Sequence, residues 1–310
     1  MPVPPNKYMS KITLPVIFGP TGVGKTELAI EVALKINAEI VSCDSCQIYK
    51  YMDIGTSKPT KEQLAKVKHW FISLITPDTP YNAWMYAKEA RQTIKEIVNR
   101  GKIPLVVGGS GLYLRALIDG FFEIPTIKDE LSTMNSQEPY DELMQVDRAT
   151  ALKLHPNDRV RILRALEVYK ATGMPMSSLK AKRVPFNCEP IYIGLTMEKD
   201  ALYKRIEKRV EQMIENGFVE EVQKILAKGY SPELTSLQTI GYKELIEYLS
   251  GKLSLEKAIE LIKRDTRRYA KRQFTWFKSI QGVQWLKMPS DTAVKKCILL
   301  FLKCNNSVVA

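Results

Sequence analysis

A glycine-rich stretch near the start of the chain has the residue types and spacing of a phosphate-binding loop. The sequence GPTGVGKT satisfies the pattern G-x-x-x-x-G-K-[ST] and stands between the apolar run LPVIF and the amphipathic run KTELAIEVALKI. In such a loop, backbone N–H groups and the following helix N-terminus surround an anion, the lysine adds a positive charge, and the threonine hydroxyl can bind Mg²⁺. The predicted phosphate-binding residues are Gly19, Pro20, Thr21, Gly22, Val23, Gly24, Lys25 and Thr26, with Thr26 as the Mg²⁺ ligand.

The loop by itself suggests ATP but does not identify the compound that carries the phosphate. A conventional P-loop ATPase or kinase also has an acidic residue after an apolar strand, which holds Mg²⁺. Here the apolar run KIPLVVGG ends in glycines, and the only acidic candidate is Asp44, after EIVSC. Its surroundings, DSCQIYKYMDIGTSKP, are unlike that second motif. The loop is therefore predicted to serve another use, and a role for Asp44 as an Mg²⁺ ligand stays open.

A second glycine cluster, GGSG, follows the third apolar run. Gly108, Gly109 and Gly111 would let the backbone approach a ligand closely, and Ser110 would offer a hydroxyl there. The alternative is a tight strand-to-helix turn. Because the carboxyl ends of parallel strands meet at one edge of a sheet, this cluster, the phosphate loop and Asp44 are predicted to lie together.

Alternating strand and helix patterns predict the elements that position these residues. LPVIF, AEIVSCD, KIPLVVGG and PIYIGLTM read as strands, with helical periodicity between the first three. We predict an α/β fold: a P-loop NTPase-like core with a parallel sheet flanked by helices. This core takes residues 1–122 and 187–310, with a helical part from residue 199 to about 277. Residues 123–186 contain no convincing strand and are predicted to be a helical insertion domain, with helices around 138–154 and 157–172.

Basic residues cluster in three places in a chain of net charge +12, a balance that suits a phosphate-rich partner. In the run 263–278 they form two adjacent rows with i,i+4 spacing, and Asp265 is the only acid. We expect these rows to contact a nucleic-acid backbone, and the aromatic residues opposite them to be core anchors. The rows are Lys263, Arg267 and Lys271, and Arg264, Arg268 and Arg272; the aromatics are Tyr269, Trp276 and Phe277. The smaller clusters are Arg159, Arg161 and Arg164 in the insertion, and Arg205 and Arg209.

Composition and hydropathy predict a cytoplasmic protein without a membrane span. No apolar run reaches the ~18 residues that a span requires, and the N-terminus lacks the apolar stretch of a signal peptide. The five cysteines (43, 46, 188, 297 and 304) form no disulfide or zinc pattern and are predicted to be reduced thiols. Nothing in the sequence demands more than a monomer.

Seven segments, in chain order, resemble the tRNA dimethylallyltransferases (isopentenyl-diphosphate:tRNA transferases) of the bacterial type. They span residues 15 to 280, and the second and last are far more specific than the phosphate loop. The segments are GPTGVGKT, DSCQIYKYMDIGTSKPT, VGGSGLYLRAL, HPNDRVRILRALEVYKATG, RIEKRVEQMIENG, TIGYKE and RRYAKRQFTWF.

This resemblance implies transfer of the dimethylallyl group from dimethylallyl diphosphate to N6 of adenosine 37. That adenosine lies beside the anticodon in tRNAs that read codons starting with U. The phosphate loop would hold the donor's diphosphate with Mg²⁺ at Thr26. Diphosphate leaves as the allylic carbon develops positive charge, so N–H donors, Lys25 and a metal on the leaving group would lower the barrier.

The resemblance also assigns roles to individual residues. Asp44 matches the aspartate that takes the N6 proton, and Ser110 keeps the hydroxyl where most members have threonine. Arg205 or Arg209 assists the diphosphate clamp, and which of them does so stays open. The adenosine would have to leave its stack to reach the site. The residues implied to contact tRNA are Asp44, Ser45, Cys46, Gln47 and Ser110 at the flipped base, Val160, Arg161, Ile162, Leu163 and Arg164 on the anticodon stem-loop, and Arg267, Arg268, Lys271 and Arg272 along the phosphates.

The sequence departs from the family pattern in the insertion, which is shorter than usual and has Ser132 where an arginine is common. Three other functions stay as alternatives. An adenylate isopentenyltransferase, acting on free nucleotides, would need neither the arginines of the insertion nor the basic run. A P-loop nucleotide kinase would need the acidic residue that is missing, and a non-enzymatic RNA-binding protein would not need an intact loop and Asp44.

Overall fold

The computed structural model describes residues 11–122 and 138–305, so Ser132 lies outside the described residues. The chain divides into two compact units, one of residues 1–114 with 187–310 and the other of residues 115–186. The sequence placed the boundary after residue 122, whereas the structure places it within helix α4 (Gly111–Asp119). The two units are described separately below.

The first unit is built on a six-stranded parallel sheet in the order β3-β2-β4-β1-β5-β6. This confirms the predicted α/β core with a parallel sheet. The strands are β1 (Ile12–Phe18), β2 (Ala38–Cys43), β3 (His69–Trp70), β4 (Ile103–Gly108), β5 (Cys188–Thr196) and β6 (Gln284–Lys287). Strand β1 lies between β4 and β5, so the loops after β1, β2 and β4 meet at one edge.

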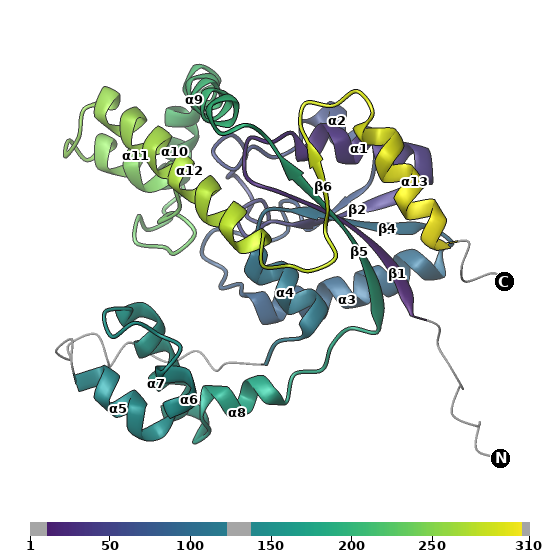
Figure 1. Ribbon diagram of the computed structural model, residues 1–310. Coiled ribbons are helices and arrows are strands. Elements are labelled where there is room, and N and C mark those ends of the chain that lie inside the picture. Colours follow the sequence, from purple (N-terminus) through teal and green to yellow (C-terminus); the bar gives the residue numbers. More distant parts are fainter. Residues whose placement is uncertain (1–10, 123–137, 306–310) are drawn as a thin grey trace, which may run out of the picture. The chain divides into compact units, whose positions relative to one another are not determined.

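Helices cover both faces of this sheet (Figure 1). Helices α1 (Lys25–Ile36) and α13 (Ala293–Asn305) pack together on one face, and α3 (Ala83–Asn99) packs on the other against β2 and β4. Apolar side chains from β1, α1, β5 and α13 form one continuous core there. The burial of this apolar surface is the main force that holds the strand ends in place.

The remaining helices of the first unit are mostly C-terminal. They are α2 (Lys61–Lys66), α9 (Lys199–Glu215), α10 (Phe218–Ala227), α11 (Tyr242–Leu249) and α12 (Leu255–Phe277). Helix α12 begins at Ser254, whose side chain accepts a hydrogen bond from the Lys257 N–H, and ends with Phe277 stacked on Phe18 at 4.5 Å. This contact fixes the end of α12 against β1.

The second unit contains helices around a small core of their own. They are α5 (Glu138–Val146), α6 (Arg148–Ala151), α7 (Arg159–Thr172) and α8 (Met176–Ala181). The sequence predicted one helix over 138–154, but the structure breaks it at Asp147. The Asp147 carboxylate accepts hydrogen bonds from the Thr150 N–H and hydroxyl and from the Ser177 N–H, so it caps α6 and binds the start of α8.

None of the helices in the described ranges is both long and apolar enough to cross a membrane.

Candidate active site

The loop between β1 and α1 has the conformation of an anion-binding loop. Gly24 precedes α1 with a φ of 98°, a left-handed conformation that strongly favours glycine. The first turn of α1 therefore begins directly at Lys25 and Thr26, and its unpaired N–H groups and positive dipole end are directed at the loop. A bound anion would satisfy these N–H groups.

Lys25 folds back over this loop. Its Nζ donates hydrogen bonds to the carbonyl oxygens of Gly19 (2.9 Å) and Pro20 (3.0 Å). Burial lowers the pKa of Lys25 to about 8; the nearby Asp44 carboxylate partly offsets this and Arg209 adds to it. The ammonium is therefore held in an electropositive place where a bound anion would restore its ordinary pKa.

Two arginines of α9 lie against the loop, and the sequence had left open which of them does so. Arg209 Nη1 donates to the Thr21 hydroxyl (3.1 Å), and Arg209 Nε donates to the Ser57 hydroxyl (2.7 Å). The Arg205 guanidinium lies over Gly24, 3.7 Å from the position that a Cβ would take there. Burial lowers the pKa of the Arg209 guanidinium, against the raising effect of Asp44. Both cations thus line the phosphate loop, Arg209 the more buried of the two.

Asp44 follows β2 at the same edge of the sheet. Its Oδ1 accepts hydrogen bonds from the N–H groups of Cys46 (2.9 Å) and Gln47 (3.3 Å), which fixes the carboxylate on a tight turn. The Ser110 hydroxyl, from the loop after β4, accepts from the Ser45 N–H (3.0 Å). Asp44 and Ser110 are therefore brought together, and the charge of Asp44 is close enough to affect the pKa of Lys25.

Cys43 and Cys46, the two cysteines on either side of Asp44, lie here as neutral thiols. Burial raises the pKa of both Cys43 and Cys46 to about 12, and Asp44 adds to the effect in each case. Together with Cys188 and Cys297 they are unbridged, as predicted, and the side chain of Cys304 lies outside the described residues. Burial therefore favours the neutral thiol form of both side chains near neutral pH.

The glycines of GGSG make room for protein rather than for a ligand, which corrects the first of the two interpretations. A Cβ on Gly108 would overlap the Cys43 carbonyl, one on Gly109 would lie 2.5 Å from Gln273 Nε2, and one on Gly111 would lie 2.5 Å from the Trp276 ring. These glycines allow β4 to approach β2 and allow α12 to pack over the loop. The alternative of a tight strand-to-helix turn is the one that fits.

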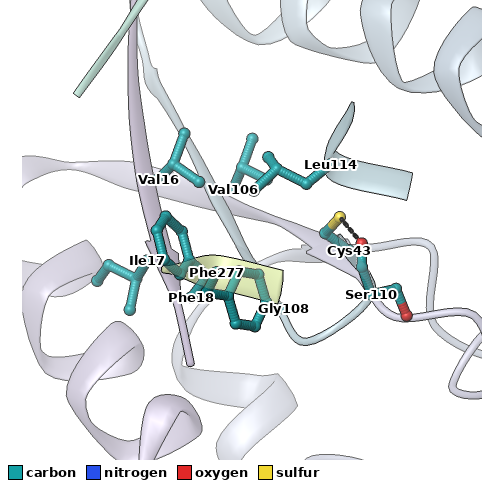
Figure 2. Close-up of a pocket in the computed structure, with 9 residues that line it drawn as sticks. All are labelled: Val16, Ile17, Phe18, Cys43, Val106, Gly108, Ser110, Leu114 and Phe277. Atoms are coloured by element: carbon teal, nitrogen blue, oxygen red, sulfur yellow. Dashed lines mark hydrogen bonds between the residues drawn. The ribbon is translucent and has the colours of Figure 1, made fainter. Parts of the chain in front are cut away.

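Beneath this loop the protein is dry and closely packed. Figure 2 shows a small apolar pocket that Ser110 helps to line, with Cys43 Sγ donating to the Ser110 carbonyl oxygen (3.7 Å). It has no room for a water molecule, and its other lining residues are Val16, Ile17, Phe18, Val106, Gly108, Leu114 and Phe277. These residues are closely packed core next to the site, and the pocket is too small for a substrate.

A larger cavity of about 340 Å³ lies beside the phosphate loop. Pro20 of the loop forms part of its wall, and two lysines, Lys199 of α9 and Lys271 of α12, line it together with apolar and aromatic side chains. The rest of the lining is Thr196, Met197, Leu202, Tyr203, Ala270 and Phe274. A cavity of this character can hold a small amphipathic anion.

The basic rows of α12 were predicted to contact nucleic acid, but several of their side chains pair with acidic residues of the protein itself. Arg267 pairs with Glu207 (2.6 Å) and Lys263 with Glu211 (2.5 Å), both acids of α9, so this row ties two helices together. Lys271, the third member of the row, lines the cavity instead. Arg264 and Arg268 share Asp265, at 2.9 and 3.4 Å. Arg268 and Arg272 are exposed, and Arg272 lies over the Tyr269 ring at 5.8 Å.

In the second unit the residues expected to contact RNA are split between surface and core. Val160 is 81% exposed, and Arg161 is exposed with an ion pair to Asp158 (2.8 Å). Ile162 is 1% exposed and belongs to the core of this unit, so its side chain is not available to a ligand. Leu163 packs against the same core, and Arg164 pairs with Glu167 (2.7 Å). A helix that packs on one face cannot present five consecutive side chains, which explains the correction.

Comparison with known proteins gives the family. The model of the IPP transferase family matches residues 47–280, most of the chain. The chain belongs to the IPP transferase family.

Named relatives of this family cover nearly the whole chain. A tRNA dimethylallyltransferase of Pelotomaculum thermopropionicum is 44% identical over 96% of this chain and 98% of its own. A crystal structure of a tRNA isopentenylpyrophosphate transferase from Staphylococcus epidermidis is 38% identical, with a TM-score of 0.71 over 96% of this chain and 100% of that one. A eukaryotic dimethylallyltransferase, solved acting on tRNA, is 31% identical with a TM-score of 0.76, over 90% of this chain and 74% of that one.

Three residues that position the site in this IPP transferase family member were not predicted. Gln273 is buried in α12; its Oε1 accepts from the Thr21 N–H (2.9 Å), and its Nε2 donates to the Gly109 carbonyl (2.9 Å). Tyr269, expected to be a core anchor, lies beside Ser110, where burial and the Asp44 charge raise its pKa. Ser57 contacts Arg209. Of the three, only Gln273 could have been noticed in the sequence, because it is a polar residue on the helix face that Ala270 and Phe277 bury.

Proposed function

We propose that this chain transfers the dimethylallyl group of dimethylallyl diphosphate to N6 of adenosine 37 in tRNAs that read codons starting with U. One observation carries the proposal: β1 and β2 both pair in parallel with β4, so the Asp44 carboxylate after β2 and the phosphate loop after β1, with Lys25 and Arg209, lie at one edge of the sheet. A base and a cradle for an anionic leaving group therefore share one site. The names of the relatives support the same transfer.

The reaction requires a leaving group to be held and an amine to be deprotonated. The bond between the allylic carbon and the diphosphate oxygen breaks, N6 bonds that carbon, and the N6 proton passes to Asp44. An exocyclic amine is a poor nucleophile, because its lone pair is delocalised into the ring. A carboxylate fixed by the Cys46 and Gln47 N–H groups can orient the amine and accept its proton. Lys25, Arg209 and the N-terminus of α1 stabilise the charge that develops on the diphosphate.

The residues at the loop fit a Mg²⁺ ion that is shared with the substrate. Among the described residues no three His, Cys, Asp or Glu side chains gather as a metal cluster. Mg²⁺ commonly uses one or two protein oxygens and takes the rest from phosphate and water. Thr26 would supply its hydroxyl, with the Asp44 carboxylate as the alternative ligand. A bound Mg²⁺ would neutralise charge on the departing diphosphate.

We assign the cavity beside Pro20 to the donor. Lys199 and Lys271 place positive charge along its wall, next to the phosphate loop, and the apolar lining suits an isoprenoid chain. Lys271 is accordingly assigned to the donor rather than to tRNA.

We assign three exposed arginines and one exposed apolar residue to tRNA. They are Arg268 and Arg272 on α12, and Val160 and Arg161 in the second unit; Lys271 is exposed as well but lines the cavity assigned to the donor. Binding through phosphates gives affinity without sequence information, so the choice of adenosine depends on residues at the Asp44 turn. The chain is proposed to act as a cytoplasmic monomer.

One assay separates this function from its alternatives. The protein is incubated with radiolabelled dimethylallyl diphosphate and an unmodified anticodon stem-loop, with AMP, or, for a kinase, with ATP and an acceptor. We expect label in the RNA and in neither AMP nor any product that depends on ATP. Label in AMP alone would indicate an adenylate isopentenyltransferase, and phosphoryl transfer would indicate a kinase.

A further inference from the structure

Ser57 has a backbone conformation that is unfavourable for a residue with a side chain. Its φ is 49°, in the left-handed region where residues other than glycine and asparagine are uncommon. The conformation is fixed by a turn in which the Ser57 N–H donates to the Ile54 carbonyl (2.9 Å). Glycine would fit this position with less strain, so the serine hydroxyl calls for a separate explanation.

The hydroxyl orients Arg209, the half-buried arginine of α9 that lies against the phosphate loop. Arg209 Nε donates to Ser57 Oγ at 2.7 Å, and Nη1 of the same guanidinium donates to Thr21 Oγ1 at 3.1 Å. A guanidinium has five N–H donors, so three remain for other acceptors. Both partners are neutral hydroxyls, so they fix the plane of the guanidinium and leave its positive charge for an anion in the loop.

The carbonyl of the same residue holds the turn that contains Asp44. Gln47 Nε2 donates to the Ser57 carbonyl (3.1 Å) and to the Thr56 carbonyl (3.3 Å). The Gln47 N–H in turn donates to the Asp44 carboxylate (3.3 Å). One residue therefore contacts the cation of the donor site with its side chain and the turn of the proposed base with its backbone.

The segment around Ser57 is itself anchored from α10. The Glu221 carboxylate accepts hydrogen bonds from the N–H groups of Asp53 (2.9 Å), Ile54 (2.7 Å) and Gly55 (3.1 Å), and from the Tyr242 hydroxyl (2.7 Å). Charge-assisted bonds of this kind are stronger than neutral ones. Ser57 is thus presented to Arg209 from a rigid support.

We propose that Ser57 is a positioning residue: its hydroxyl holds Arg209 in the orientation that receives the diphosphate, while its carbonyl holds the Asp44–Gln47 turn. This inference rests on the proposed function. It predicts that the hydroxyl contributes to donor affinity, although it touches neither substrate.

Ser57→Gly tests the inference, because it should lower donor affinity without lowering stability. Glycine relieves the positive φ, so the thermal midpoint should be unchanged or higher. Loss of the hydroxyl should raise the KM for dimethylallyl diphosphate and the Kd for inorganic pyrophosphate with Mg²⁺ by about tenfold. The kcat should change much less, because Asp44 and its turn keep their backbone contacts. Ser57→Ala should weaken pyrophosphate binding by a similar factor.

Two controls make the outcome decisive. Asn37→Gly removes a side chain from another left-handed position (φ 52°), at the far end of α1, and should leave KM and pyrophosphate affinity unchanged. In an Arg209→Lys background, which keeps the charge but loses the planar donor set, Ser57→Gly should add little to KM. Pyrophosphate affinity of Ser57→Gly equal to wild type, or additive effects of the two changes, would overturn the inference. Failure of the wild-type protein to label RNA would instead overturn the proposed function.

Discussion

The phosphate loop and the segment after β2 lie at the same edge of the sheet but are held in different ways. In the phosphate loop, Lys25 binds the Gly19 and Pro20 carbonyls, partners no more than six residues away. The segment from Asp44 to Lys58 depends on distant residues: Ser110, Arg209 and Glu221. The phosphate loop also receives two distant contacts at Thr21, from Gln273 and Arg209, but its left-handed Gly24 and its lysine bonds are local. The segment after β2 is held mainly by distant residues.

The two regions also differ in how much they reveal about the reaction. A locally encoded loop binds phosphate in many proteins and does not reveal what the phosphate is attached to. The segment that is held by distant contacts places a carboxylate at the same edge as that loop, and this carboxylate is the proposed base. Changes in the two regions should accordingly have separable effects.

Asp44→Ala should have the largest effect and should be confined to the transfer step. Loss of the proposed base is expected to lower kcat by about 10²–10⁴-fold. The affinity for an anticodon stem-loop should stay within about tenfold of wild type. Single-turnover transfer and filter binding, measured on the same protein, check this. If RNA binding collapses while the residual rate at saturating RNA is normal, Asp44 recognises the substrate and is not the base.

Lys25→Met should strongly weaken donor binding and at the same time stabilise the ligand-free protein. The variant loses the point charge on the diphosphate, and we expect pyrophosphate affinity to fall by about 10²-fold. It also removes an ammonium whose burial is unfavourable, so the thermal midpoint should rise by a few degrees. Calorimetric titration and thermal unfolding measure the two effects. A lower midpoint would mean that the bonds to the loop carbonyls outweigh the cost of burial.

The pH dependence of stability should carry the signature of the same lysine. The pKa of Lys25 is about 8 in the folded protein, below its ordinary 10.5, so the unfolded chain binds more protons between these values. Folding stability attributable to Lys25 therefore rises as the pH increases from about 8 to 10.5, and its cost is fully present below pH 8. The difference in midpoint between Lys25→Met and wild type should shrink over that range. A constant difference would show that Lys25 does not titrate there.

Replacing Arg268 and Arg272 by glutamine should weaken RNA binding by about tenfold and lower the salt slope by about one to two. Pyrophosphate affinity should not change, because both side chains are exposed on α12. The matched control replaces Lys263 and Arg267, which pair with α9; it should lower the thermal midpoint and leave the salt slope unaltered. If the control variant lost more RNA binding than the Arg268 and Arg272 variant, the RNA contacts would belong to the row of Lys263 and Arg267 instead.

Lys271→Gln should have the smallest effect and decides to which substrate that residue belongs. As a residue of the donor cavity, it should raise the donor KM by about threefold and leave the salt dependence of RNA binding unchanged. A reduced salt slope with normal KM would return Lys271 to the RNA-binding surface.

Local patterns predicted the sheet, the phosphate loop and the position of Asp44, because these depend on strand ends and on a glycine with a left-handed backbone. The partners of α12 could not be predicted, since helical periodicity gives the residues that share a face but not the element opposite. A signal was present: Glu207 and Glu211 have the same i,i+4 spacing as Lys263 and Arg267. The short edge strands β3 and β6 were also missed, since they are too brief to show a period.

The single amide of Gln273 has a consequence for how the two substrates affect each other. It joins the Thr21 N–H to the Gly109 carbonyl, so a shift of α12 at this residue would either move both loops or break these two hydrogen bonds. The same helix carries Arg268 and Arg272 on its exposed side. An RNA that docks on this helix and an anion that binds in the loop are therefore mechanically linked through one side chain. Thermodynamic reciprocity then requires that whatever factor the RNA adds to anion affinity, the anion adds to RNA affinity.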